Sequence, residues 1–122
     1  MKRVKGRYEV EGVALPSVTT ILGTLGKPQL LAWYAKIAAE EGDASAPRRR
    51  GKEAADRGTA VHAIIQAHLS GAPRPASLPD IAPYVDGWDA FASSHSIRPV
   101  ILERPVWNTT AGYAGQCDLV AT

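Results

Sequence analysis

Two acidic residues in the C-terminal third of the chain have the types and the spacing to hold a metal ion. Glu103 lies in the alternating stretch 100–107 and Asp118 in the alternating stretch 113–120, and a polar turn separates the two stretches. Such a pattern predicts two β-strands joined as a hairpin. Two carboxylates completed by water form the ligand set that hard cations such as Mg²⁺ and Mn²⁺ prefer.

The register of this hairpin decides whether the two carboxylates meet. If Trp107 faces Ala114 without a bulge, Glu103 faces Asp118 directly. Like charges opposite each other destabilise a sheet unless a cation lies between them or water solvates both. The register therefore predicts a metal site, with two solvated charges as the open alternative. A bulge at a neighbouring glycine would break the register.

Histidine offers a third candidate ligand. His62 lies in a helix predicted over about 52–69, at the edge of its apolar stripe and one turn after Gly58. A glycine there permits the close approach of a strand, so the imidazole could reach a metal held by the sheet. A histidine that is only hydrogen-bonded is the alternative. His68 is expected to be structural and His95 to be exposed to solvent.

Basic and aromatic side chains could contact nucleic acid. Arginines at a loop-to-helix junction suit phosphate contacts. A basic set lies at one predicted junction: Arg48, Arg49, Arg50, Lys52 and Arg57. Trp33 lies off the apolar stripe of its helix and is a candidate for stacking on bases. Tyr34 and Trp88 stand at helical spacing from other apolar residues and are expected in the core. A solvated charge run is the alternative to phosphate binding.

The elements that must position these residues run in the order hairpin, helices, hairpin. Residues 8–15 alternate around a Glu-Gly turn, and Ser17 is a candidate N-cap. Helices are predicted over about 18–25, 28–41, 52–69 and 81–91, with a basic linker at 42–52 and a proline-rich loop at 71–79. This order indicates an α+β or α/β unit. No repeat or composition shift divides the chain, so residues 1–122 are predicted to form a single domain without an internal boundary.

Composition excludes several classes of protein. The chain has 122 residues, 45% hydrophobic and 21% charged, with a net charge of +2, which is ordinary for a globular domain. A lone cysteine, Cys117, excludes a disulfide framework within the chain and fits a reducing cytoplasm. Alternation along the strand places it on the sheet face opposite Asp118. No apolar run is long enough to span a membrane, and no secretory signal is present. Motifs for ATP, dinucleotide, zinc-protease and serine-hydrolase sites are absent.

Four stretches, in order and spacing, resemble the RecB-type exonuclease branch of the PD-(D/E)XK nuclease superfamily. This branch includes phage exonucleases and the mitochondrial genome maintenance exonuclease. The stretches are LPSVTTIL at 15–22, RGTAVH at 57–62, LE at 102–103 and GYAGQCDLV at 112–120. Each motif is short, and the resemblance extends over nearly the whole chain, from residue 15 to residue 120.

The resemblance implies a restriction-endonuclease-like α/β core and a DNA exonuclease that hydrolyses phosphodiester bonds with Mg²⁺ or Mn²⁺. It implies that His62 and Asp118 match metal-site residues, with Glu103 beside them as a supporting carboxylate. The hydroxyl-bearing segment with Ser17, Thr19 and Thr20 would line the path of the DNA, which would be single-stranded or a duplex end. A bacterial or phage-infected cytoplasm is the location that the branch implies.

One departure from the family pattern limits the expected activity. The family's next strand carries an Asp or Glu, one further residue and a Lys, whereas no Asp or Glu stands two residues before any lysine here. We therefore expect the N-terminal and central part of a nuclease domain, inactive alone, which self-associates through its C-terminal strand. The alternatives are a non-catalytic DNA-binding or assembly domain derived from such a nuclease, and a helical adaptor with an accidental histidine.

Overall fold

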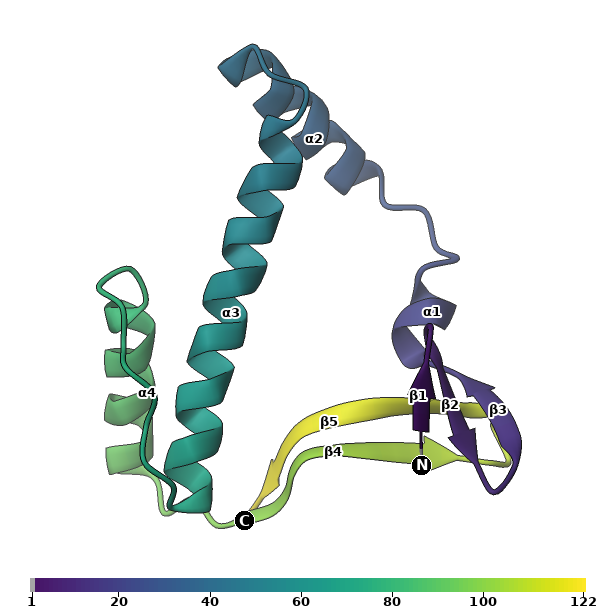
Figure 1. Ribbon diagram of the computed structural model, residues 1–122, viewed down its shortest axis with the longest axis vertical. Helices are drawn as coiled ribbons and strands as arrows, with labels where there is room; N and C mark the ends of the chain where they lie inside the picture. Colours follow the sequence, from purple (N-terminus) through teal and green to yellow (C-terminus); the bar gives the residue numbers. More distant parts are fainter. Residues whose placement is uncertain (1) are drawn as a thin grey trace. The chain divides into compact units, whose positions relative to one another are not determined.

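The computed structural model describes residues 2–122, which fold as two compact units (Figure 1). The β-rich unit combines residues 2–26 with Pro99–Ala121, and the helical unit combines Lys27–Arg98 with Thr122. The predicted class, mixed α and β with a hairpin, helices and a second hairpin in that order, is confirmed. Among the described residues, no helix combines the length and the apolar character needed to cross a membrane.

Three short antiparallel strands open the chain and form a sheet in the order β1-β2-β3: β1 (Lys2–Val4), β2 (Arg7–Val10) and β3 (Val13–Pro16). The predicted hairpin is confirmed, with Tyr8 paired to Leu15. Its turn residues Glu11 and Gly12 have φ angles of 50° and 78°, the left-handed geometry that suits the twist of a two-residue hairpin turn. Strand β1 was not predicted.

Helix α1 (Val18–Leu22) follows directly and is capped as predicted. The Ser17 hydroxyl accepts the backbone N–H of Thr20 at 3.1 Å, which satisfies a donor in the helix's first turn. The helix ends at Gly23 instead of continuing through Leu25. Beyond Gly23 the backbone continues in tighter turns, since the N–H groups of Thr24 and Leu25 each donate to the carbonyl three residues earlier at 3.1 Å.

The helical unit holds three helices: α2 (Pro28–Glu41), α3 (Ala46–Ser70) and α4 (Ala82–Ser94). Helix α2 starts at proline and ends at Gly42 with φ 62°, as predicted. The predicted basic linker at 42–52 is wrong, because α3 already begins at Ala46. Ala46 and Pro47 are buried, so packing holds the first turn of α3 where glycine and charge suggested a loop.

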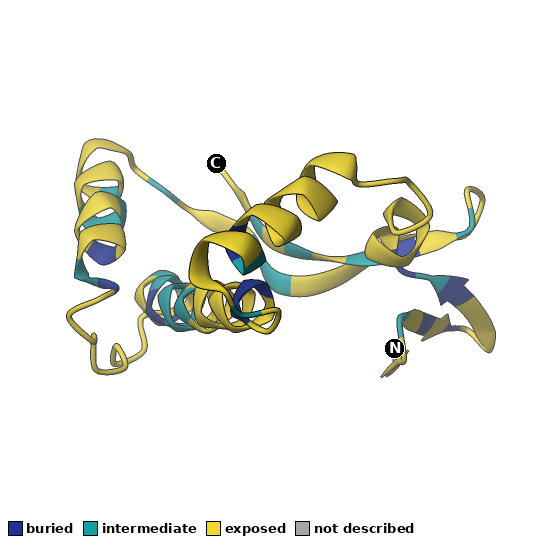
Figure 2. Ribbon diagram, turned by 90° about the horizontal axis from the view of Figure 1, so that it is seen from above, coloured by how far each residue is buried: buried dark blue, intermediate teal, exposed yellow. Residues whose placement is uncertain are grey.

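The core of the helical unit lies between α3 and α4. Ile64, Ile81 and Val85 form a buried cluster with Ala60 and Val61 packed against it, which confirms part of the predicted apolar stripe. Most of each helix is nevertheless exposed (Figure 2). The expectation that Tyr34 lies in the core is wrong, since this residue is 41% exposed. Among the described residues of α2, only Ile37 is buried.

His68 ties α4 to α3, as the structural role predicted for it requires. Its Nδ1 accepts the indole N–H of Trp88 at 2.8 Å and lies 2.8 Å from a guanidinium nitrogen of Arg74. Arg74 in turn pairs with Asp89 of α4 at 2.6 Å, so the proline-rich loop is fastened to the helix that follows it. Trp88 is only half-buried, and His95 is exposed as predicted, stacked on a neighbouring phenylalanine.

The second hairpin consists of β4 (Pro99–Asn108) and β5 (Tyr113–Ala121), close to the predicted bounds. The only register shift in the described pairing lies at the far end, between Pro99 and Ile101. Ala114 of β5 is fully buried in a cluster with residues of β2 and β3, and it forms a parallel bridge with Ser17. These contacts join both hairpins of the β-rich unit.

Candidate metal centre

Glu103 lies opposite Asp118 in the hairpin of β4 and β5. The pairs on either side of it are in one continuous register: Leu102 with Leu119 and Arg104 with Cys117. A carboxylate oxygen of Glu103 and one of Asp118 lie within 4.8 Å of each other. The predicted register is confirmed, since Trp107 pairs with Ala114 and neither glycine near the turn introduces a bulge.

The backbone of Glu103 departs from ordinary strand geometry. Its φ is +48°, a left-handed conformation that non-glycine residues adopt rarely, at a cost of about 1–2 kcal/mol. The strand pairing on both sides keeps the same register, so this is a local turn of the backbone without an inserted residue. Backbone strain of this kind collects at binding and catalytic sites.

Gln116 orients the Glu103 carboxylate. Its side-chain amide donates to Glu103 Oε2 at 2.9 Å. Gln116 stands two residues before Asp118, so both side chains emerge on the same face of β5. No role was predicted for Gln116. Its position two residues before Asp118 could have suggested that both side chains lie on one face of the strand.

The burial pattern of β5 shows which face carries the carboxylates. Gln116, Asp118 and Val120 are exposed, whereas Gly115, Cys117 and Leu119 are half-buried. Cys117 therefore lies opposite Asp118 as predicted, although it is half-buried and not a core residue. Asp118 is on the solvent side, where a hydrated cation has access.

The donor set of this pair suits a hard divalent cation. Oxygen ligands lie about 2.0–2.1 Å from Mg²⁺, so two of them on one ion are about 3–4 Å apart. The Glu103 and Asp118 oxygens, within 4.8 Å, would reach such a spacing by small side-chain rotations. Cations of this type also keep several water ligands, which the exposure of Asp118 allows.

His62 belongs to the helical unit. It lies on α3 with its side chain exposed, at the edge of the apolar stripe as predicted. It lines a pocket of about 320 Å³ together with Arg57, Gly58 and Tyr84. Its convergence with Glu103 and Asp118 stays a prediction.

Comparison with known proteins adds no relative. The chain has no significant match to a family model, a curated protein or a solved structure. Its nuclease resemblance therefore rests on the four sequence stretches.

The hydroxyl groups predicted to line a DNA path also hold the fold together. Ser17, which is buried, contacts the hydroxyls of Thr19 at 3.0 Å and Thr20 at 2.8 Å. Thr20 donates further to the Gly6 carbonyl at 3.0 Å. Thr19 and Thr20 are both exposed, but the Thr20 hydroxyl already donates to the Gly6 carbonyl, so Thr19 has the better access to a ligand. DNA contact by the three hydroxyls stays a prediction.

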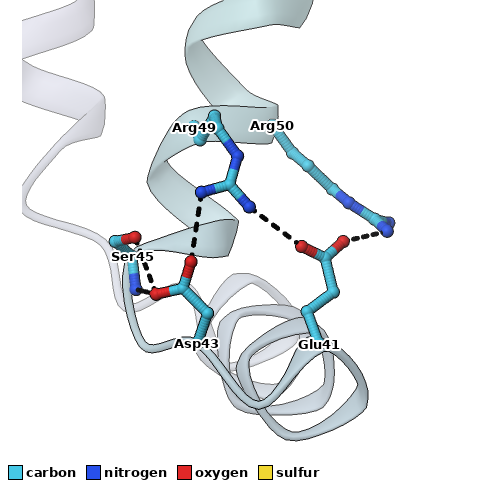
Figure 3. Close-up of polar contacts among 5 residues, drawn as sticks. All are labelled: Glu41, Asp43, Ser45, Arg49 and Arg50. Carbon is cyan, nitrogen blue, oxygen red and sulfur yellow. Dashed lines mark hydrogen bonds and ion pairs between the residues drawn. The ribbon is translucent and has the colours of Figure 1, made fainter.

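The basic run at the start of α3 is engaged in ion pairs (Figure 3). Arg49 donates to Asp43 and to Glu41, each at 3.1 Å, and Arg50 pairs with the second oxygen of Glu41. Lys52 is likewise paired, with an aspartate one turn later, at 2.6 Å. Their charges are partly balanced within the chain, which weakens the case for phosphate binding by this run. Two further residues were predicted to contact nucleic acid, and their exposure differs: Arg57 is half-buried and Trp33 is 36% exposed.

The same corner of α2 and α3 contains a carboxyl group, Asp43, whose pKa is strongly lowered. Two hydrogen bonds from Ser45, one from its hydroxyl and one from its backbone N–H, together with the Arg49 guanidinium, lower the pKa of Asp43 to about 2. The pKa of Arg49 is raised in turn, chiefly by its hydrogen bond with Asp43. Both pKa shifts arise from contacts at the connection between α2 and α3, and neither involves a residue of the candidate metal centre.

Proposed function

We propose that this chain supplies carboxylates to the divalent-metal site of a DNA nuclease of the PD-(D/E)XK type. The observation that carries the proposal is the register that sets Glu103 against Asp118 with oxygens within 4.8 Å. The four resembling stretches support it, since both acids fall inside them. The restriction-endonuclease-like core that the resemblance implies is part of the proposal.

Each residue of the proposed centre has a distinct task. Asp118, which is exposed, is the principal ligand, and Glu103 is the supporting one. The Gln116 amide orients the Glu103 carboxylate by a hydrogen bond to Oε2. His62 is the proposed nitrogen ligand. These residues would hold Mg²⁺ or Mn²⁺, which would supply polarisation of a phosphodiester and a lowered pKa for a bound water.

The DNA would be held by side chains away from the two carboxylates. Arg57 offers a guanidinium for the phosphate backbone, and Trp33 offers an exposed ring for base stacking. Thr19 offers a hydroxyl beside the cap of α1. Contacts of these kinds position a strand without reading its sequence, which is what an exonuclease requires.

A second candidate is a non-catalytic domain that binds DNA with a structural metal. The observation favouring it is the lack of any Asp or Glu two residues before a lysine. In the nuclease family that lysine positions and activates the attacking water. Both candidates share the metal centre and differ only in whether cleavage follows.

Calorimetric titration of the purified chain with MnCl₂ and MgCl₂ tests the proposal. The wild type should bind one ion, and Asp118→Asn and Glu103→Gln should each weaken binding about tenfold or more. Glu9→Gln, which removes an exposed carboxylate from β2 in the same unit, is the matched control and should bind as the wild type does. Equal affinities in all four proteins would refute the proposed centre.

A further inference from the structure

A pocket of about 320 Å³ lies between α3 and α4 of the helical unit. Tyr84 of α4 closes one side, and the other lining residues all belong to α3: Ala54, Arg57, Gly58, Val61 and His62. These α3 positions recur at steps of three and four, so they form one continuous face of the helix. The pocket is therefore a built feature of two packed helices, held in place by the buried cluster below it.

Gly58 of α3 forms the floor of the pocket. A glycine inside a helix lowers helix stability relative to alanine, so a structural reason for it is usually close contact with a neighbour. Here, apart from the adjacent residues and the backbone of α3 itself, no described atom lies within 4 Å of the place that a Cβ at position 58 would occupy, and the same holds for Gly51. The glycine therefore serves no packing contact within the described chain, and it keeps the floor of the pocket open down to the helix backbone.

The walls of the pocket indicate the chemistry of the occupant. The Tyr84 ring is 57% exposed, and its phenol offers a flat apolar face for stacking. Arg57, half-buried at the other side, offers a planar guanidinium that matches a phosphate. An aromatic ring and a guanidinium across an open floor suit a ligand that is flat at one end and anionic at the other.

Nearby carboxylates do not cancel this preference. Asp56 is held by Lys52 at 2.6 Å, and the charge of Glu53 acts on Arg49 of the preceding turn. Both acids, together with Asp80, line a neighbouring pocket, which shares only Arg57 with this one. The side of Arg57 that faces Tyr84 is therefore lined by neutral groups and by an imidazole.

We propose that this pocket binds one nucleotide of a single DNA strand, with the base stacked on Tyr84 above Gly58 and the phosphate on Arg57. A volume of about 320 Å³ lies at the lower end of the range for pockets that enclose small ligands. The inference rests on the proposed function, because His62 lines the pocket and is the proposed nitrogen ligand of the metal.

Filling the pocket tests the inference. Gly58→Leu projects a side chain into it, whereas Gly51→Leu makes the same change on the same helix, outside the pocket, where an added Cβ also meets nothing. Both variants should raise the melting temperature, because leucine favours helix over glycine. Binding of a fluorescein-labelled single-stranded oligonucleotide, followed by anisotropy, should weaken about tenfold in Gly58→Leu and in Tyr84→Leu. Gly51→Leu should bind as the wild type does.

Two further binding measurements distinguish a failure of this inference from a failure of the proposed function. An oligonucleotide carrying abasic sites should bind the wild type as weakly as the intact one binds Gly58→Leu. The mononucleotide dAMP should shift the amide signals of Gly58 and Tyr84 in the wild type and not in Gly58→Leu. If Gly58→Leu and Gly51→Leu bind the oligonucleotide equally, or if the wild type binds neither probe, the pocket is not a nucleotide site. The Mn²⁺ titration of Asp118→Asn decides the metal centre independently of either result.

Discussion

Glu103 and Asp118 face each other across β4 and β5, with carboxylate oxygens within 4.8 Å, and Gln116 donates to Oε2 of Glu103. Two like charges at this distance repel by about 1 kcal/mol even at the dielectric constant of water. A sheet keeps such a pair at a cost unless a cation lies between them or water solvates both. Asp118 is exposed, but Glu103 is half-buried, so water solvates it only in part. The arrangement is therefore better suited to binding a cation than to stabilising the isolated hairpin.

Gln116→Ala should weaken metal binding while leaving stability almost unchanged. The amide holds Glu103 in place by one hydrogen bond, and loss of such a partner typically reduces metal affinity about tenfold or more. Because Gln116 is exposed, the free energy of unfolding should change by less than about 0.5 kcal/mol. Calorimetry with MnCl₂ gives the affinity, with Gln29→Ala, an exposed glutamine of α2, as the control. Unchanged affinity in Gln116→Ala would show that the hydrogen bond has no part in the centre.

Glu103→Asn should separate stability from metal binding. Asparagine tolerates the left-handed conformation at φ +48° better than glutamate does. The variant should be as stable as the wild type or more stable, by up to about 1 kcal/mol, and should lose most of its Mn²⁺ affinity. Urea unfolding and calorimetry measure the two effects. A marked loss of stability would mean that the glutamate side chain itself holds the hairpin.

The register of the second hairpin could be predicted because it depends on local information. A polar turn between two alternating stretches fixes which residues face each other, and a shift by one residue would turn every side chain to the wrong face. Ser17 as a cap and Gly42 as a helix end were predicted for the same reason, since both roles follow from local backbone chemistry.

Features set by tertiary contacts could not be read from the sequence. Helix α3 begins at Ala46 because Ala46 and Pro47 are buried, and neither the glycine nor the arginine run around them reveals that burial. Strand β1 is short and basic, and only its pairing with β2 makes it a strand. The positive φ of Glu103 was likewise hidden, since glutamate carries no local preference for it.

The α2–α3 corner should loosen in acid through Asp43. Its pKa is lowered to about 2 from the model-peptide value of 3.8 by hydrogen bonds from Ser45 and the charge of Arg49. A lowered pKa in the folded state means that the contribution to stability is full above about pH 4 and is lost as the pH falls toward 2. The difference in stability between wild type and Asp43→Asn should therefore shrink over that interval in chemical denaturation. A difference that is constant with pH would contradict the assigned cause.

The chain by itself should not cleave DNA. Without an acid two residues before a lysine, it lacks the groups that complete the metal site and activate water in this nuclease family. A labelled single-stranded or duplex oligonucleotide incubated with the purified chain and Mg²⁺ or Mn²⁺ should remain intact. Metal-dependent cleavage that disappears in Asp118→Asn would overturn this expectation and would make the chain a complete catalyst.

The most direct test of the metal centre is paramagnetic broadening by Mn²⁺ in an amide NMR spectrum of the full chain. A bound Mn²⁺ broadens the signals of nearby amides, so substoichiometric ion should act first on Leu102, Glu103, Cys117, Asp118 and Leu119. The same ion should leave those signals sharp in Asp118→Asn. Broadening that starts at other carboxylates, such as Glu53 and Asp56, or that persists in Asp118→Asn, would contradict a metal centre at Glu103 and Asp118.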